Sequence, residues 1–164
     1  MKVNDGRTDP VLARERDASG RAVPAMFRRI LVPVDFTRKT VSAVRTAGRL
    51  AQSLAAEVTL LHVIERIDDD TTVLKKFYRQ LEENARNKMR PLVDALVGKK
   101  VQVRSEILYG NRVAEILRFA EDSRTDLIVM SSHKLPVRRP TIESWGTISY
   151  KVGILSRCPV LLVK

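Results

Sequence analysis

The sequence predicts an α/β domain built on one doubly wound, five-stranded parallel sheet. Two short apolar runs rich in β-branched residues, at 30–34 and 127–130, are typical of strands buried on both faces. Around these runs, strand-like segments alternate with segments of helical period, which is the pattern of parallel sheets. The length of 164 residues allows one such domain with a full core and is too short for two comfortable ones.

Composition indicates a soluble globular protein. Hydrophobic residues make up 44% of the sequence, and no apolar stretch is long enough to span a bilayer, so we expect no membrane partner. Residues 1–25 lack the apolar segment of a secretory signal. The single cysteine, Cys158, allows no intrachain disulfide. A cytoplasmic protein is the simplest interpretation.

The net charge of +11 raises the hypothesis of a nucleic-acid partner, because clustered lysine and arginine release counterions from phosphate backbones. However, the basic residues are scattered along predicted helical faces among acidic ones, and no aromatic residues are interleaved to stack on bases. A solvated surface is therefore favoured over specific nucleic-acid binding. Only the segment Lys134–Arg139 concentrates positive charge locally.

The first elements follow from composition and capping residues. Residues 1–25 have no helical or strand period, so we expect a disordered extension before a domain over residues 26–164. Met26 stands directly before the first strand, and one hypothesis is that translation starts there. After that strand, Thr37 or Thr40 can cap a helix. Its apolar positions follow the helical period: Val41, Val44, Gly48, Ala51 and Leu54.

A second buried strand is predicted over residues 58–64, followed by a long helix. Asp68–Thr72 provides capping residues for that helix, which is favoured over a cation site because no partner ligands accompany the acidic run. The apolar stripe of the helix keeps a spacing of three to four: Val73, Phe77, Leu81, Ala85, Met89, Leu92 and Leu96. Pro91 predicts a kink, or a restart with Pro91 in a first turn. Gly98 and the two lysines after it are typical of a helix end.

The second half of the chain continues the alternation. A strand over residues 101–108 alternates only in part, so we expect it at the sheet edge. Gly110-Asn111 then caps a third helix. The fourth strand leads through a loop to a last helix that starts near Gly146-Thr147, and residues 160–163 form the fifth strand. The last helix is expected to place three apolar residues on one face: Ile148, Val152 and Leu155. Right-handed crossovers put helices on both faces of such a sheet.

Polar residues follow the first and fourth strands. Asp35 comes directly after the first, and Ser131-Ser132-His133 ends the fourth. Open α/β sheets bind ligands in the crevice outside the carboxyl ends of their strands, so we expect a site there. The sequence contains no nucleophile–base set, no Walker loop and no strand-linked G-x-G-x-x-G. Two histidines and one distant cysteine do not make a metal site either. We therefore expect a binding protein and not an enzyme.

Four blocks of sequence, in this order and spacing, resemble the universal stress protein family: 30–37, 60–63, 129–133 and 146–163. The resemblance runs from Arg28 to Lys164. It implies a Rossmann-like fold with strand order 3-2-1-4-5, a crevice between strands 1 and 4, and a role in stress response. It also implies a homodimer, often formed through the last strand. The physical reason is that Val160–Val163 would otherwise leave an apolar edge unpaired.

Nucleotide-binding members of the family carry a loop of the form G-x2-G-x9-G-[S/T] after the fourth strand. In this chain the first glycine falls on Ser131 and the second on Lys134, while the last pair survives as Gly146-Thr147 with eleven residues before it instead of nine. A Cβ costs about 1 kcal/mol or more wherever the backbone must be left-handed, and it keeps phosphates at a distance. Lys134, Arg138 and Arg139 can compensate by neutralising phosphates.

The resemblance further implies that Asp35 and Val63 contact the base, with Pro33 nearby. The nucleotide-binding residues are therefore expected to be Pro33, Val34, Asp35, Val63, Met130, Ser131, His133, Lys134, Gly146, Thr147 and Ile148. The expected ligand is ATP, or AMP or ADP, with Mg²⁺ only if ATP binds. The alternative, favoured by the loss of both early glycines, is a nucleotide-free interaction module whose Lys134–Arg139 loop meets a protein partner.

Several of these residues also have a purely structural interpretation. Asp35 is equally suited to cap the first helix, and Thr147 and Ser149 cap the last helix whether or not they contact phosphate. His62 lies within an apolar strand and is expected to be a hydrogen-bonded core histidine. His133, at the end of strand 4, is the better functional candidate of the two.

Overall fold

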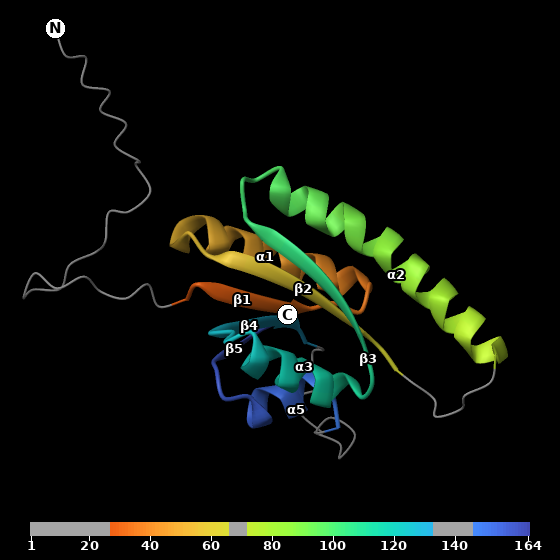
Figure 1. Cartoon of the computed structure of the whole chain (residues 1–164). Coiled ribbons are helices and arrows are strands. Elements are labelled where there is room, and N and C mark those ends of the chain that lie inside the picture. The colour runs from red at the N-terminus through yellow and green to blue at the C-terminus, as the bar shows by residue number, and fades with distance from the viewer. Residues whose placement is uncertain (1–26, 66–71, 133–145) are drawn as a thin grey trace, which may run out of the picture.

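A computed structural model describes residues 27–65, 72–132 and 146–164 (Figure 1). The elements, in chain order, are β1 (Arg29–Pro33), α1 (Arg38–Leu54), β2 (Glu57–Ile64), α2 (Thr72–Val97), β3 (Val103–Tyr109), α3 (Arg112–Asp122), β4 (Leu127–Ser131), α5 (Ile148–Leu155) and β5 (Val160–Val163). The strands form one parallel sheet in the order β3-β2-β1-β4-β5, which confirms the predicted order. No helix in these ranges is long and apolar enough to cross a membrane.

The sheet separates two apolar cores. Side chains that alternate along β1, Ile30 and Val32 on one side and Leu31 on the other, are all buried because helices cover both faces. Helices α1 and α2 cover one face, and α3 and α5 cover the other (Figure 1). The prediction of strands buried on both faces is therefore confirmed for β1 and β4.

The apolar stripes of the helices were predicted with a phase that is partly wrong. Val41 on α1, Phe77 on α2 and Leu155 on α5 are all exposed. The buried face of α1 includes three of the predicted residues, Val44, Gly48 and Ala51, together with Thr40, Ala43 and Ala47. Alanine and glycine let α1 approach the sheet closely, so small residues mark the inner face as well as large apolar ones do.

Two further predictions need correction at element boundaries. The third strand begins at Val103 and not at Val101, although Val101 itself is buried. It lies at the sheet edge as predicted. Helix α2 continues through Pro91 without a restart. Pro91 and Asn87 are exposed, so water can bond the carbonyl that proline deprives of a partner. The predicted Asp68–Asp70 cap lies outside the described residues.

Gly48 marks the tightest contact between α1 and α2. A Cβ added there would lie 2.6 Å from Cδ2 of Leu96, a fully buried side chain. The same atom added at Gly153 on α5 would meet nothing within 4 Å.

We predict opposite effects for one chemical change at these two glycines. Gly153→Ala should raise the free energy of unfolding by about 0.5–1 kcal/mol through helix propensity alone. Gly48→Ala should lower it, because displacing Leu96 costs about 1–3 kcal/mol and outweighs that gain. Urea unfolding of both variants measures the difference, and a Gly48→Ala variant as stable as Gly153→Ala would show that the two helices do not pack this closely.

Candidate functional site

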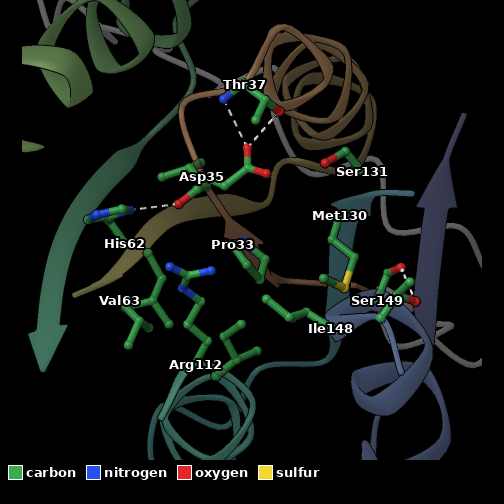
Figure 2. A pocket seen from close by; sticks show the side chains of 14 residues that line it. Pro33, Asp35, Thr37, His62, Val63, Arg112, Met130, Ser131, Ile148 and Ser149 are labelled. Atoms are coloured by element: carbon green, nitrogen blue, oxygen red, sulfur yellow. Dashed lines mark hydrogen bonds between the residues drawn. The ribbon is translucent and has the colours of Figure 1, made fainter. Parts of the chain in front are cut away.

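The crevice lies where the strand order reverses, with β2 on one side of β1 and β4 on the other. A cleft of about 480 Å³ opens there, at the carboxyl ends of β1, β2 and β4 and the first turns of α3 and α5 (Figure 2). Its lining residues are Pro33, Val34, Asp35, Thr37, Leu61, His62, Val63, Arg112, Ile116, Met130, Ser131, Thr147, Ile148 and Ser149. Half of these residues are apolar, and the other half bring polar or charged groups to the cleft. Sites for small organic molecules combine the two in this way.

The chain turns from β1 into α1 around the carboxylate of Asp35. Its Oδ1 accepts hydrogen bonds from the backbone N–H of Thr37 at 3.0 Å, from the Thr37 hydroxyl at 2.8 Å and from the Thr40 hydroxyl. Thr40 is only 1% exposed, so its hydroxyl depends on this partner. Thr37 occupies the N-cap position of α1, but its side chain makes no capping hydrogen bond. Asp35 bonds the N–H of Thr37 itself, directly before the helix.

The second oxygen of Asp35 is available to a ligand. None of the hydrogen bonds among the described residues uses Oδ2, which points toward the β4 side of the crevice in Figure 2. Burial raises the pKa of this carboxyl, but the bonds from Thr40 and Thr37 outweigh burial and hold the pKa below its usual value. Asp35 is therefore ionised at neutral pH and can accept a hydrogen bond from a hydroxyl or amino group.

Phe36 and His62 build the wall beside Asp35. Phe36 has a φ of 60°, a left-handed conformation that a non-glycine residue adopts at a cost of about 1–2 kcal/mol. Its ring packs on His62 with centroids 4.4 Å apart, and Nζ of Lys88 lies 5.7 Å from the Phe36 centroid. His62 Nδ1 lies 2.8 Å from the carbonyl oxygen of Val34, so Nδ1 carries the proton and donates it (Figure 2).

On the opposite rim, hydroxyl groups gather at the N-terminus of α5. Thr147 caps the helix, since its Oγ1 accepts from the N–H of Tyr150 at 3.3 Å. Oγ of Ser149 lies 3.4 Å from Oγ1 of Thr147 and 3.5 Å from Oγ of Ser132. The N-terminus of a helix presents free N–H groups and partial positive charge, so this rim suits an anionic group.

The predicted site residues that are described lie at the crevice, with one exception. Pro33, Val34, Asp35, Val63, Met130, Ser131, Thr147 and Ile148 all line it. Gly146 is exposed and is not among the lining residues, although it directly precedes Thr147. His133 and Lys134 lie outside the described residues.

Sequence reasoning missed several lining residues. Thr37 and Leu61 belong to the sequence blocks described above but were not assigned to the site, and Arg112 and Ile116 belong to no block. Arg112 could have been found only by asking which helix starts face the carboxyl ends of β1 and β4. His62 is hydrogen-bonded as predicted, but it is half-buried and not a core residue, and it lines the crevice.

We predict that His62 titrates below its ordinary value of 6.5, mainly because burial disfavours the imidazolium. Below pH 6.5 the unfolded chain then binds more protons at this histidine than the folded protein does. The protein should therefore lose stability as pH falls from 6.5 through the lowered pKa of the folded state. A His133→Gln variant leaves His62 as the chain's only histidine, since the sequence has two. NMR should show a midpoint below 6.5 with the proton on Nδ1, and a midpoint near 6.5 in urea. A folded-state midpoint above the urea value would contradict the geometry.

Comparison with known proteins gives a consistent result. The model of the universal stress protein family matches residues 26–164. Universal stress protein YxiE of Bacillus subtilis is 29% identical over 157 residues, covering 85% of this chain and all of the relative. MJ0577 of Methanocaldococcus jannaschii is also 29% identical over 157 residues, covering 85% of this chain and 96% of its own. Its solved structure superimposes with a TM-score of 0.69. Universal stress protein UspA from Lactobacillus plantarum, 24% identical, gives 0.71 over 86% of this chain and all of its own. The chain belongs to the universal stress protein family.

Proposed function

We propose that this universal stress protein acts in stress response by binding an adenine nucleotide, ATP or else AMP or ADP, in the crevice between β1 and β4. The observation that carries the proposal is the pairing of two unlike rims across one apolar cleft. An ionised carboxylate with an unused oxygen stands on one rim, and hydroxyls at a helix N-terminus stand on the other. The volume of about 480 Å³ falls within the roughly 300–1,000 Å³ of small-molecule sites.

The base and ribose belong to the β1–β2 side. Pro33, Val34 and Val63 provide apolar surface for a planar ring, and Asp35 Oδ2 accepts from a ribose hydroxyl or a base amino group. Met130 and Ile148 continue this apolar floor toward α5. These contacts need only the side chains and backbone that the crevice already presents.

The phosphates belong to the α5 side. Gly146 and Thr147 lead into α5, whose first N–H groups attract anionic oxygens, and Ser149 adds a buried hydroxyl. Ser131 ends β4 at the same rim. Its Cβ keeps phosphates further from the backbone than a glycine would. We propose that the side chains of Lys134, Arg138 and Arg139 supply the missing attraction, with Mg²⁺ taking part only if ATP is the ligand.

Structures of more distant relatives support an adenine ligand for this fold. One universal stress protein, 18% identical with a TM-score of 0.69, was solved in complex with cAMP. That of Archaeoglobus fulgidus, 16% identical with a TM-score of 0.65, was solved in complex with dAMP. At this level of identity the likeness shows a shared fold, and the two complexes show that proteins of this fold can hold an adenine nucleotide.

The second candidate is a nucleotide-free, dimeric interaction module. Ser131 stands where nucleotide-binding members of the family carry their first loop glycine. This difference favours a loop that does not bind nucleotide phosphates. In that case the basic Lys134–Arg139 segment would meet an acidic protein partner. Both candidates describe a cytoplasmic protein that works by binding and not by catalysis.

The nucleotide proposal predicts that freshly purified protein releases an adenine nucleotide on denaturation, and that the emptied protein binds ATP with micromolar affinity. Mass spectrometry and calorimetry measure the two quantities. Asp35→Ala and Gly146→Val should each weaken binding at least about tenfold, through the base or ribose and through the phosphates respectively.

Asp122→Ala is the matched control for this series, because it removes a carboxylate from the α3 surface, where Asp122 pairs with Arg118. Asp35→Asn keeps one oxygen for the threonine bonds and separates loss of charge from loss of fold. Empty protein that binds no ATP would refute the nucleotide proposal and leave the interaction module. Unchanged affinity in both site variants would place the nucleotide elsewhere.

We also propose a homodimer that forms through the free edge of β5. Leu161 and Leu162 are 39% and 38% exposed on this edge strand, an arrangement that invites pairing with a second copy. Two apolar edge strands that pair would cover these leucines and satisfy the open backbone groups.

This proposal predicts a mass of twice 18.6 kDa by light scattering, and a monomer for the double variant Leu161→Lys, Leu162→Lys. Both side chains are exposed, so the substitution should leave the fold intact. Val41→Lys, an equally exposed apolar position on α1, should leave the dimer unchanged. A dimeric double variant would show that β5 is not the interface.

A further inference from the structure

Arg112 occupies a position that helix stability does not explain. It is the first residue of α3, and the cap of that helix is Asn111, whose side chain accepts from the N–H of Ala114 at 3.1 Å. A positive charge at a helix N-terminus faces the positive end of the helix dipole, which is unfavourable. The arginine therefore lowers the stability of α3, and we look for its role outside the helix.

The guanidinium of Arg112 reaches into the crevice. Figure 2 shows it between Val63 and Pro33, on the far side of the cleft from Ile148 and Ser149. Glu65, directly after β2, pairs with it at 3.0 Å between Nη2 and Oε2. The two side chains are 47% and 57% exposed, so the ion pair contributes little stability. Its effect is to hold the planar group at the mouth of the crevice.

Arg112 also forms the boundary between two hollows. A second cleft of about 380 Å³, between the end of β2 and α2, shares His62, Val63 and Arg112 with the first. A ligand ring lying on Val63 would thus end against the guanidinium and not continue along an open groove.

We propose that Arg112 is a specificity-determining residue that recognises a purine ring in the crevice, with Glu65 positioning it. This inference rests on the proposed nucleotide function. The guanidinium carries five N–H donors in one plane, and the ion pair occupies one edge of it. The rest can stack on a base or donate to a ring nitrogen. Because Arg112 lies opposite the hydroxyls of α5, it meets the base and not the phosphates.

The test compares the affinities of AMP and CMP by calorimetry on nucleotide-free full-length protein. The wild type should prefer AMP at least about tenfold, because the two-ring base extends further toward the guanidinium. Arg112→Ala should reduce the ratio of the two dissociation constants about fivefold or more, mainly by weakening AMP binding. Arg112→Lys should fail to restore the ratio, since a lysine keeps the charge and loses the planar donors.

Arg118→Ala is the matched control. It removes the same charge from the same helix, but Arg118 pairs with Glu115 and Asp122 outside the crevice, so the ratio should not change. Alanine favours helix, and removing a cation from the first turn relieves the dipole, so Arg112→Ala should fold. Three results would overturn the inference while leaving the proposed function intact. They are an Arg112→Ala variant that binds AMP and CMP equally more weakly, an Arg112→Lys variant with the wild-type ratio, and an Arg118→Ala variant that changes the ratio as much as Arg112→Ala. A wild type that binds neither AMP nor CMP, and neither ATP nor ADP in the same assay, would refute the proposed function and the inference with it.

Discussion

The hydrogen bonds to one carboxylate oxygen fix the rim of the crevice. Oδ1 of Asp35 receives the N–H and hydroxyl of Thr37 and the hydroxyl of buried Thr40, and so joins the end of β1 to the start of α1. The turn between them is tight enough to put Phe36 at a φ of 60° and to lay its ring on His62. His62 in turn bonds the carbonyl of Val34. Asp35, Phe36 and His62 therefore form one local network, and the shape of the crevice depends on it.

The same network explains how one residue serves both fold and site. A carboxylate has two oxygens with about four acceptor positions, and the helix uses only Oδ1. Oδ2 faces the crevice with its charge maintained by the low pKa. At the other rim Thr147 caps α5, since its side chain accepts from the N–H of Tyr150. In a sheet with this topology, both rims face a single crevice.

Local sequence patterns predicted the strands and the edge of the sheet where the crevice lies, whereas the strand order was implied by the family resemblance. Strands buried on both faces leave continuous apolar runs, and the polar residue that ends each run marks the carboxyl edge of the sheet. The buried faces of the helices were harder to predict, because a helical spacing of apolar residues does not by itself say which face points inward. Val41 and Phe77 fit the predicted stripes and are nevertheless exposed. Arg112 was not predicted as a lining residue because it reaches the crevice through the packing of α3 against β2 and α5, which no local pattern records. Segment 133–145, which holds most of the predicted phosphate loop, lies outside the described residues.

The central claim is that an adenine nucleotide lies across this crevice, from Val63 to the N-terminus of α5. Titration of isotope-labelled protein with ATP, followed residue by residue by NMR, tests this claim most directly. It distinguishes binding in the crevice from nonspecific electrostatic binding of ATP to a chain of net charge +11. The account predicts saturable amide shifts confined to the ends of β1, β2 and β4 and to the first turns of α3 and α5. Shifts that are absent at Asp35, Val63 and Ser149, or that spread over basic helical surfaces and vanish with salt, would contradict it.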